Sequence, residues 1–191
     1  KDVVKLLLDN SERIDLNART NLGTTGFMMA CKKGHKDVVK LLLDHSERIE
    51  MNAKGHSDGT AFMWACQQGH KDVVKLLLDH LDSNIDLNTR DPSGWTAFML
   101  ACTFGHKDVV QLLLDNSGRI ELNAKNIFGR TAFMLTCSNG HMDVVKMLLD
   151  HSNKIELNAQ DNFGLTAIMR ACENGHNEVV RLLSRRIDKI R

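Results

Sequence analysis

One short phrase of sequence returns along the whole chain at almost constant spacing. It begins with a Gly-His pair and continues into an apolar run such as Asp37-Val38-Val39-Lys40-Leu41-Leu42-Leu43, and the chain opens on the same run at residues 1–9. The pairs lie 35, 36, 35 and 35 residues apart, at Gly34-His35, Gly69-His70, Gly105-His106, Gly140-His141 and Gly175-His176. A period of this length is typical of a repeat array, in which each unit packs mainly on its neighbours.

Each unit predicts two short helices. In the stretch from 124 to 158, Thr131 is placed to cap a first helix over 132–137, and Gly140 is placed to end it. His141 then begins a second helix, whose apolar face includes Val144, Val145 and Leu148. Helices shorter than about 12 residues are marginal in isolation, so they must pack on each other and on the next unit.

Composition and charge narrow the possible partners. The formal net charge of the 191-residue chain is +1, so we expect no general attraction to nucleic acid or to an anionic membrane. No apolar run approaches the roughly 20 residues of a membrane-spanning helix.

The cysteines follow the repeat and point to a reducing compartment. Equivalent positions in stacked helices lie about 8–10 Å apart, whereas a disulfide needs Cα atoms about 4.4–6.8 Å apart. Disulfides between units are therefore implausible, which favours a cytoplasmic or nuclear location. The five residues concerned are Cys31, Cys66, Cys102, Cys137 and Cys172.

The repeated pattern resembles the ankyrin repeat. The recurring letters are Thr-Ala-Phe-Met-x-Ala-Cys-x-x-Gly-His-x-Asp-Val-Val-x-Leu-Leu-Leu, followed by Leu-Asn-Ala, and they cover the whole chain. The resemblance implies an all-α solenoid of helix pairs with short β-hairpin fingers, forming a single domain. The expected units are a half repeat at 1–18 and repeats at about 19–53, 54–89, 90–124, 125–159 and 160–191. The period exceeds the usual 33 residues, and Met replaces the His of the family's Thr-Pro-Leu-His.

Metal binding and catalysis are weaker interpretations of the repeated histidines. Cys31 and His35 are four residues apart, but one Cys and one His per unit do not gather the four ligands of a closed zinc site. The His-x-Asp pair occurs in nearly equivalent surroundings in successive units, without a nucleophile beside it. We therefore expect structural histidines, no cofactor and no enzymatic activity.

Two further sets of residues leave alternatives open. The recurring asparagines are expected to bond local backbone in turns, while the ankyrin resemblance implies that an oxygen-sensing asparaginyl hydroxylase is an alternative. They are Asn17, Asn52, Asn88, Asn123 and Asn158. Basic residues near the C-terminus form either a solvated cap helix, which is favoured, or an anion contact. They are Arg181, Arg185, Arg186, Lys189 and Arg191.

Positions that break the repeat indicate where a partner binds. The resemblance implies a concave surface lined by the fingertips and the first helix of each pair, and large apolar side chains occupy its variable positions. We expect the centre of a protein-binding surface at Trp64, Trp95, Phe104 and Phe128. Further contacts are expected from Leu22, Phe163, Leu165, Arg130, Lys32 and Lys33. The alternative is that several of the aromatic residues pack along the fingers.

The favoured function is a non-catalytic protein–protein interaction module. The alternative is an engineered or purely structural stack without an evolved ligand, although uneven drift between units favours natural duplication. The two ends differ, because Ser184 replaces an apolar residue in the last unit, while the helix at Val3 to Leu8 keeps its apolar face. We therefore expect a piece of a longer array, or one end of it, with possible self-association through the open N-terminal helix.

Overall fold

The computed structural model describes residues 2–9, 14–80 and 84–187. Within these ranges it contains an initial helix and five consecutive helix pairs. The helices are α1 (Asp2–Asp9), α2 (Gly26–Lys33), α3 (Lys36–Leu43), α4 (Ala61–Gln67), α5 (Lys71–Asp79), α6 (Ala97–Thr103), α7 (Lys107–Asp115), α8 (Ala132–Ser138), α9 (Met142–Asp150), α10 (Ala167–Glu173) and α11 (Asn177–Ile187). Two 3-10 turns, at Ser46–Arg48 and His56–Asp58, complete the helical elements. The predicted all-α solenoid is confirmed.

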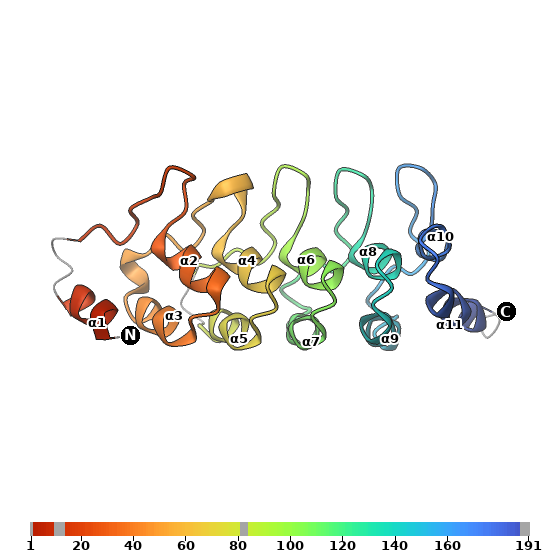
Figure 1. Ribbon diagram of the computed structural model, residues 1–191. Helices are drawn as coiled ribbons and strands as arrows, with labels where there is room; N and C mark the ends of the chain where they lie inside the picture. The colour runs from red at the N-terminus through yellow and green to blue at the C-terminus, as the bar shows by residue number, and fades with distance from the viewer. Residues whose placement is uncertain (1, 10–13, 81–83, 188–191) are drawn as a thin grey trace.

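The elements form an elongated stack of three layers (Figure 1). The inner helices α2, α4, α6, α8 and α10 make the middle row, with the outer helices α1, α3, α5, α7, α9 and α11 on one side. Fingers project from the other side, one before each inner helix. The basic residues Lys189 and Arg191 lie outside the described residues, as does the side chain of Arg186.

Threonine side chains begin the inner helices as the sequence predicts. The hydroxyl oxygen accepts a hydrogen bond from the backbone N–H three residues later, which satisfies one of the free donors of the first turn. These bonds join Met28 to Thr25, Met63 to Thr60, Met99 to Thr96 and Met134 to Thr131. Thr166 differs, because no such bond caps α10.

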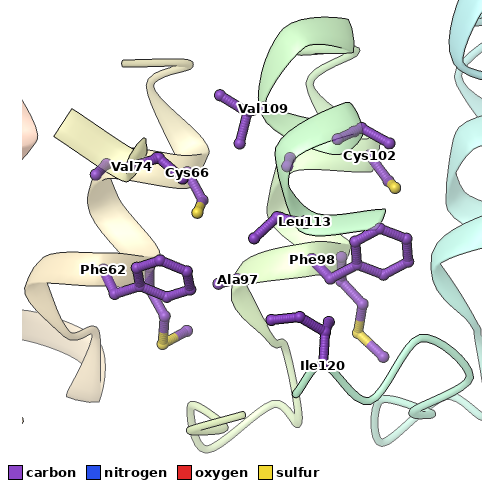
Figure 2. Packing of buried hydrophobic residues seen from close by; sticks show 14 of the residues in the cluster. Phe62, Cys66, Val74, Ala97, Phe98, Cys102, Val109, Leu113 and Ile120 are labelled. Atoms are coloured by element: carbon purple, nitrogen blue, oxygen red, sulfur yellow. The ribbon is translucent and has the colours of Figure 1, made fainter. Parts of the chain in front are cut away.

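The core lies between successive helix pairs (Figure 2). Phe62 and Cys66 on α4 point toward the next pair, where the small side chain of Ala97 on α6 leaves room for them. Phe98 and Cys102 repeat the arrangement one unit further on. These side chains are at most 2% exposed, and burying a phenylalanine stabilises a fold by about 1.5–3 kcal/mol. Large residues on one side and alanines on the other therefore hold the stack together.

The cysteines of this core are protonated thiols. Burial raises the pKa of the Cys102 thiol to about 12, and it also raises the pKa of Cys31, Cys66 and Cys137. Cys172 differs because it is exposed on α10. All five cysteines are free. The four buried thiols therefore act as small apolar side chains, since the thiolate is the reactive form.

The fingers are tight turns rather than extended hairpins. Each is closed by at least two backbone hydrogen bonds, such as Asp91 N–H to Trp95 C=O at 3.1 Å and Gly94 N–H to Asp91 C=O at 2.8 Å. In the finger arms the described residues contain a single isolated bridge, between Arg19 and Thr25, because the arms are too short for a ladder. Side chains stabilise the turns instead, and the Asp91 carboxylate accepts from the backbone N–H groups of Ser93 and Trp95.

The histidines of the Gly-His pairs join neighbouring units. The Nε2 atom of His141 lies 2.7 Å from the carbonyl oxygen of Thr103, at the end of the preceding inner helix. A carbonyl oxygen only accepts, so Nε2 carries the proton. His70, His106 and His176 make the same bond to Lys32, Gln67 and Ser138. The structural role predicted for the histidines is thus confirmed at these four positions.

The asparagines also join units, which corrects the expectation that they bond local backbone. The side-chain amide of Asn88 donates to the carbonyl of Arg119, and its oxygen accepts from the N–H of Glu121, so both groups reach the next unit. Asn17, Asn52 and Asn123 make equivalent pairs of bonds. The sequence period alone could not distinguish a turn residue from a bridge to the following turn.

Replacing Gly105 by alanine is expected to destabilise the stack by at least about 1–2 kcal/mol. The backbone of Gly105 has φ +69°, which costs an L-residue about that much, and an added Cβ would lie 2.6 Å from the Nδ1 atom of His141. Urea unfolding followed by circular dichroism would measure the loss. The matched control is Gly26→Ala, because a Cβ there meets nothing within 4 Å. Equal stability of the two variants would contradict the proposed role of the glycine.

The two ends of the stack leave apolar side chains uncovered. Leu7 on α1 is 46% exposed, whereas Leu77, its counterpart on α5, is 1% exposed. At the other end Met169 on α10 is 46% exposed, although Met134 on α8 is 1% exposed. Ser184 on α11 is exposed, and its hydroxyl donates to the Val180 carbonyl. The described side chain of α1 nearest the core is Leu8, which is buried.

Candidate protein-interaction surface

Trp64 does not lie open on the surface. Its side chain is 8% exposed and fills the space beneath its own finger, where a Cβ on Gly59 would lie 2.4 Å from the indole nitrogen. Gly55 approaches the far edge of the same ring. The Lys32 ammonium lies 4.8 Å from the ring centroid, a cation–π contact with the preceding unit. Trp64 is therefore mainly a packing residue, in agreement with the alternative that some aromatics pack along the fingers.

Trp95 is intermediate between packing and exposure. It is half-buried and packs against the core, and its backbone closes the finger that begins at Asp91. In its unit the inner-helix position equivalent to Trp64 holds Leu100, which is also half-buried. The two units thus place their tryptophan differently. One has Trp64 on the inner helix and Gly59 in the finger, and the other has Trp95 in the finger and Leu100 on the inner helix.

Phe104 is the most open aromatic residue on the inner helices. It ends α6, is 50% exposed, and stacks on His106 with ring centroids 6.2 Å apart and planes inclined by 19°. His106 is itself fixed by its bond to the carbonyl of Gln67. The ring of Phe104 is therefore held in one orientation on its buried side, while the remaining side faces solvent.

A second set of apolar side chains lies on the fingertips. Phe128 is 46% exposed, and the neighbouring Ile127, which the sequence analysis did not select, is 57% exposed. Their finger is bonded on both sides, because Ile127 N–H donates to Ser93 C=O and Phe128 C=O accepts from Asn162 N–H. The guanidinium of the half-buried Arg130 lies 5.9 Å from the Phe128 centroid. The finger thus presents an apolar tip on a fixed backbone.

Apolar exposure continues along the tips in both directions. Phe163 is 68% exposed and Leu22 is 63% exposed, while Leu165 is half-buried beneath its own tip. Met29, on α2 at the position equivalent to Trp64, is 46% exposed and was also missed. Both missed residues lie at variable positions of the repeat, where Leu22 and Leu165 were selected.

A buried ion pair supports the last finger. The Asp161 carboxylate is fully buried and accepts from the Arg170 guanidinium and from the N–H groups of Phe163 and Leu165. Arg170 also bonds Glu173 at 2.9 Å. Burial alone would raise the pKa of Asp161, but these hydrogen bonds outweigh it and hold that pKa below its usual value. This charge network is structural, because its groups already satisfy one another.

Positive charge is concentrated at one end of the surface. Lys32 and Lys33 end α2 and are exposed, and within the described ranges no carboxylate forms an ion pair with either. Glu173, at the other end, is paired with Arg170. The surface therefore changes from cationic near α2 to neutral near α10.

The structure offers no metal centre in its described part. Within residues 2–9, 14–80 and 84–187, no three His, Cys, Asp or Glu side chains come together in a way that could hold a metal ion. Among those same residues, no helix combines the length and apolar character needed to cross a membrane.

Comparison with known proteins identifies the family. The family model described as "Ankyrin repeats (3 copies)" matches residues 1–91, 47–126 and 119–191, which together cover the chain. The protein belongs to the ankyrin repeat family. No curated protein gives a significant match. Ankyrin repeats are generally protein–protein interaction modules and are typically non-catalytic.

Proposed function

We propose that this chain is a non-catalytic module that binds another protein on the face formed by its fingertips and the carboxyl ends of its inner helices. The observation that carries the proposal is the exposure of Phe104, Phe128 and Phe163 on rigid elements of one stack. The exposed part of an aromatic side chain contributes little to folding, whereas the side chain can contribute about 2 kcal/mol or more to binding when a partner buries it.

The set of contact residues follows from the exposures. Phe104 and Phe128 form the centre, with Phe163, Leu22 and Arg130 around them and Lys32 and Lys33 at one end. Trp95 and Leu165 contribute their exposed edges, and Trp64 acts through the shape of its finger. Met29 and Ile127 extend the set, because their exposed fractions of 46% and 57% lie within the range of 46–68% spanned by Phe104, Phe128 and Phe163.

The test is loss of partner capture in a variant that remains folded. The double variant Phe104→Ala/Phe128→Ala is expected to keep the wild-type unfolding midpoint, since both side chains are about half exposed. Proteins captured from a cell extract by the immobilised wild type should be lost, with affinity falling at least about tenfold. The control is Met169→Ala, which removes an exposed apolar side chain of α10 that lies outside the proposed surface. Unchanged capture by the double variant would contradict the proposed surface.

Other properties of the protein stay predictions. A purely structural or engineered stack predicts no saturable capture by the wild type at all. Self-association through α1 is supported by the exposure of Leu6 and Leu7, and a sedimentation coefficient that rises with concentration would reveal it. The proposed location is cytoplasmic or nuclear, where the free cysteines stay reduced.

A further inference from the structure

One residue from each inner helix forms a continuous line along the stack. It is the residue immediately before the glycine of each Gly-His pair, and all five members are exposed. This cap row consists of Lys33, Gln68, Phe104, Asn139 and Asn174. Each lies at the carboxyl end of its helix, so neighbouring members are separated by one step of the stack.

The chemistry of the cap row is not uniform. Lys33 is cationic, and together with Lys32 it has no ion pair in the described part of the chain. Gln68 carries a carboxamide, which can donate to and accept from a peptide backbone. Phe104 then presents a half-exposed ring fixed by His106. A ligand that follows this line meets positive charge, an amide and an aromatic platform in that order.

The spacing of the cap row selects the conformation of such a ligand. Packed helices lie about 8–10 Å apart, so Lys33 and Phe104 are separated by about 16–20 Å over two steps. A polyproline-II segment rises about 3.1 Å per residue and has three residues per turn, so the same face returns every 9.3 Å or so. Six residues therefore span the two steps and keep both contact side chains on one face. An α-helix, rising about 1.5 Å per residue, would need about 12 residues.

We propose that the cap row binds an extended acidic peptide segment, in which a pair of carboxylate residues and an aromatic residue are six positions apart. The carboxylates pair with Lys32 and Lys33, the backbone crosses Gln68, and the aromatic side chain stacks on Phe104. This proposal rests on the proposed function and specifies the partner's chemistry and register. The charge contact determines which end of the peptide lies near α2. At the α10 end of the stack, Arg170 is already paired with Asp161 and Glu173 and does not attract the carboxylates of the peptide.

Synthetic peptides test the register directly. Fluorescein-labelled 14-residue peptides of proline, alanine and serine carry two glutamates and one phenylalanine at a separation of four, five, six, seven or twelve positions, in both chain orders. Fluorescence anisotropy with the full chain should show the tightest binding at six. Binding should weaken at least about threefold at five and seven, where the ring leaves the shared face. Equal affinities at all separations, or tightest binding at twelve, would overturn the proposal.

Variants of the protein assign the contacts. Phe104→Ala is expected to weaken the six-residue peptide at least about tenfold, whereas Asn139→Ala, one step beyond the peptide, should leave affinity unchanged. The double variant Lys32→Glu/Lys33→Glu should abolish binding and recover it with a peptide in which lysines replace the glutamates. Failure of this charge exchange would refute the assigned contact, since a merely structural lysine would not respond to the peptide's charge.

The outcome for the proposed function can be read separately. If no peptide binds up to millimolar concentration, while Phe104→Ala/Phe128→Ala still abolishes capture of a protein partner, the peptide register is wrong and the interaction surface stands. If capture is unaffected by the double variant, the interaction surface itself is refuted.

Discussion

Replacing Trp64 by alanine is expected to lower the free energy of unfolding by about 3–5 kcal/mol. The ring is 8% exposed and fills the space between its finger, Gly59 and the Lys32 ammonium of the preceding unit, so its removal leaves a cavity. The measurement is equilibrium urea unfolding followed by circular dichroism. Phe104→Ala is the matched control and should change stability by less than about 1 kcal/mol, because half of that ring is already solvated. Equal losses in the two variants would contradict the distinction between packing and contact aromatics.

The contact between Trp64 and Gly59 allows a sharper test. A Cβ at residue 59 would lie 2.4 Å from the indole nitrogen, although the backbone of Gly59, with φ −72° and ψ 136°, suits any residue. Gly59→Ala should therefore destabilise the wild type and be tolerated in a Trp64→Leu background. A double-mutant cycle should give a coupling of about 1 kcal/mol or more. If the stability changes of Gly59→Ala and Trp64→Leu were additive, the packing of the Trp64 ring would not require a glycine at residue 59.

Replacing Asp161 by asparagine is expected to cost about 2–3 kcal/mol. Asparagine keeps the side-chain oxygen that accepts from the backbone N–H groups of Phe163 and Leu165, as Asn126 does in the preceding finger. The substitution removes the carboxylate of Asp161, however, and leaves the buried Arg170 paired with Glu173. Losing one partner of a buried pair typically costs about 3–5 kcal/mol, and Glu173 reduces that cost. The last unit should unfold first, so hydrogen exchange in α10 and α11 is the most sensitive measurement.

The chain itself provides the rescue of this variant. The double variant Asp161→Asn/Arg170→Leu reproduces the combination Asn126 and Leu135 of the preceding unit, which lacks a charge at both positions. It should recover most of the lost stability, because the buried guanidinium of Arg170 is removed together with its partner. If the double variant were as unstable as Asp161→Asn, loss of the ion pair would not be the cause.

The same ion pair determines a dependence on pH. The pKa of Asp161 is lower in the folded protein than its unfolded value near 3.9, so its stabilisation is fully present above that value. It is lost as pH falls from about 4 through the lower folded pKa. The stability difference between wild type and Asp161→Asn should therefore shrink below about pH 4 and stay constant from pH 5 to 7.

The sequence predicts the helices and helix caps of this protein well, because equivalent residues pack in the same way in each unit. The caps at Thr25 and Thr131 and the structural role of His141 follow from letters that recur at a fixed position, whereas the bond of His141 to the preceding unit was not predicted. The asparagine bridges were misassigned because Asn88 bonds residues 31 and 33 positions away, and only the stacking of units brings those atoms together.

The candidate surface was harder to predict because it depends on departures from the repeat. A position whose residue differs between units tolerates different side chains, but the difference does not show whether the side chain is buried. Trp64 is covered because glycines stand at 55 and 59, whereas Phe104 is open because its neighbours along the stack are the polar Gln68 and Asn139. Exposure thus depends on the residues that the same finger and the adjacent units place around a side chain, and a single position does not reveal it.

Hydrogen exchange with and without a captured partner tests the proposed surface most directly. The partner is expected to slow exchange at the backbone amides of the fingers at 126–130 and 161–165 and at the carboxyl end of α6, residues 103–105, while α5, α7 and α9 remain unchanged. Protection confined to these outer helices, with unchanged exchange in the fingers, would contradict a partner-binding face formed by the fingertips and inner helices.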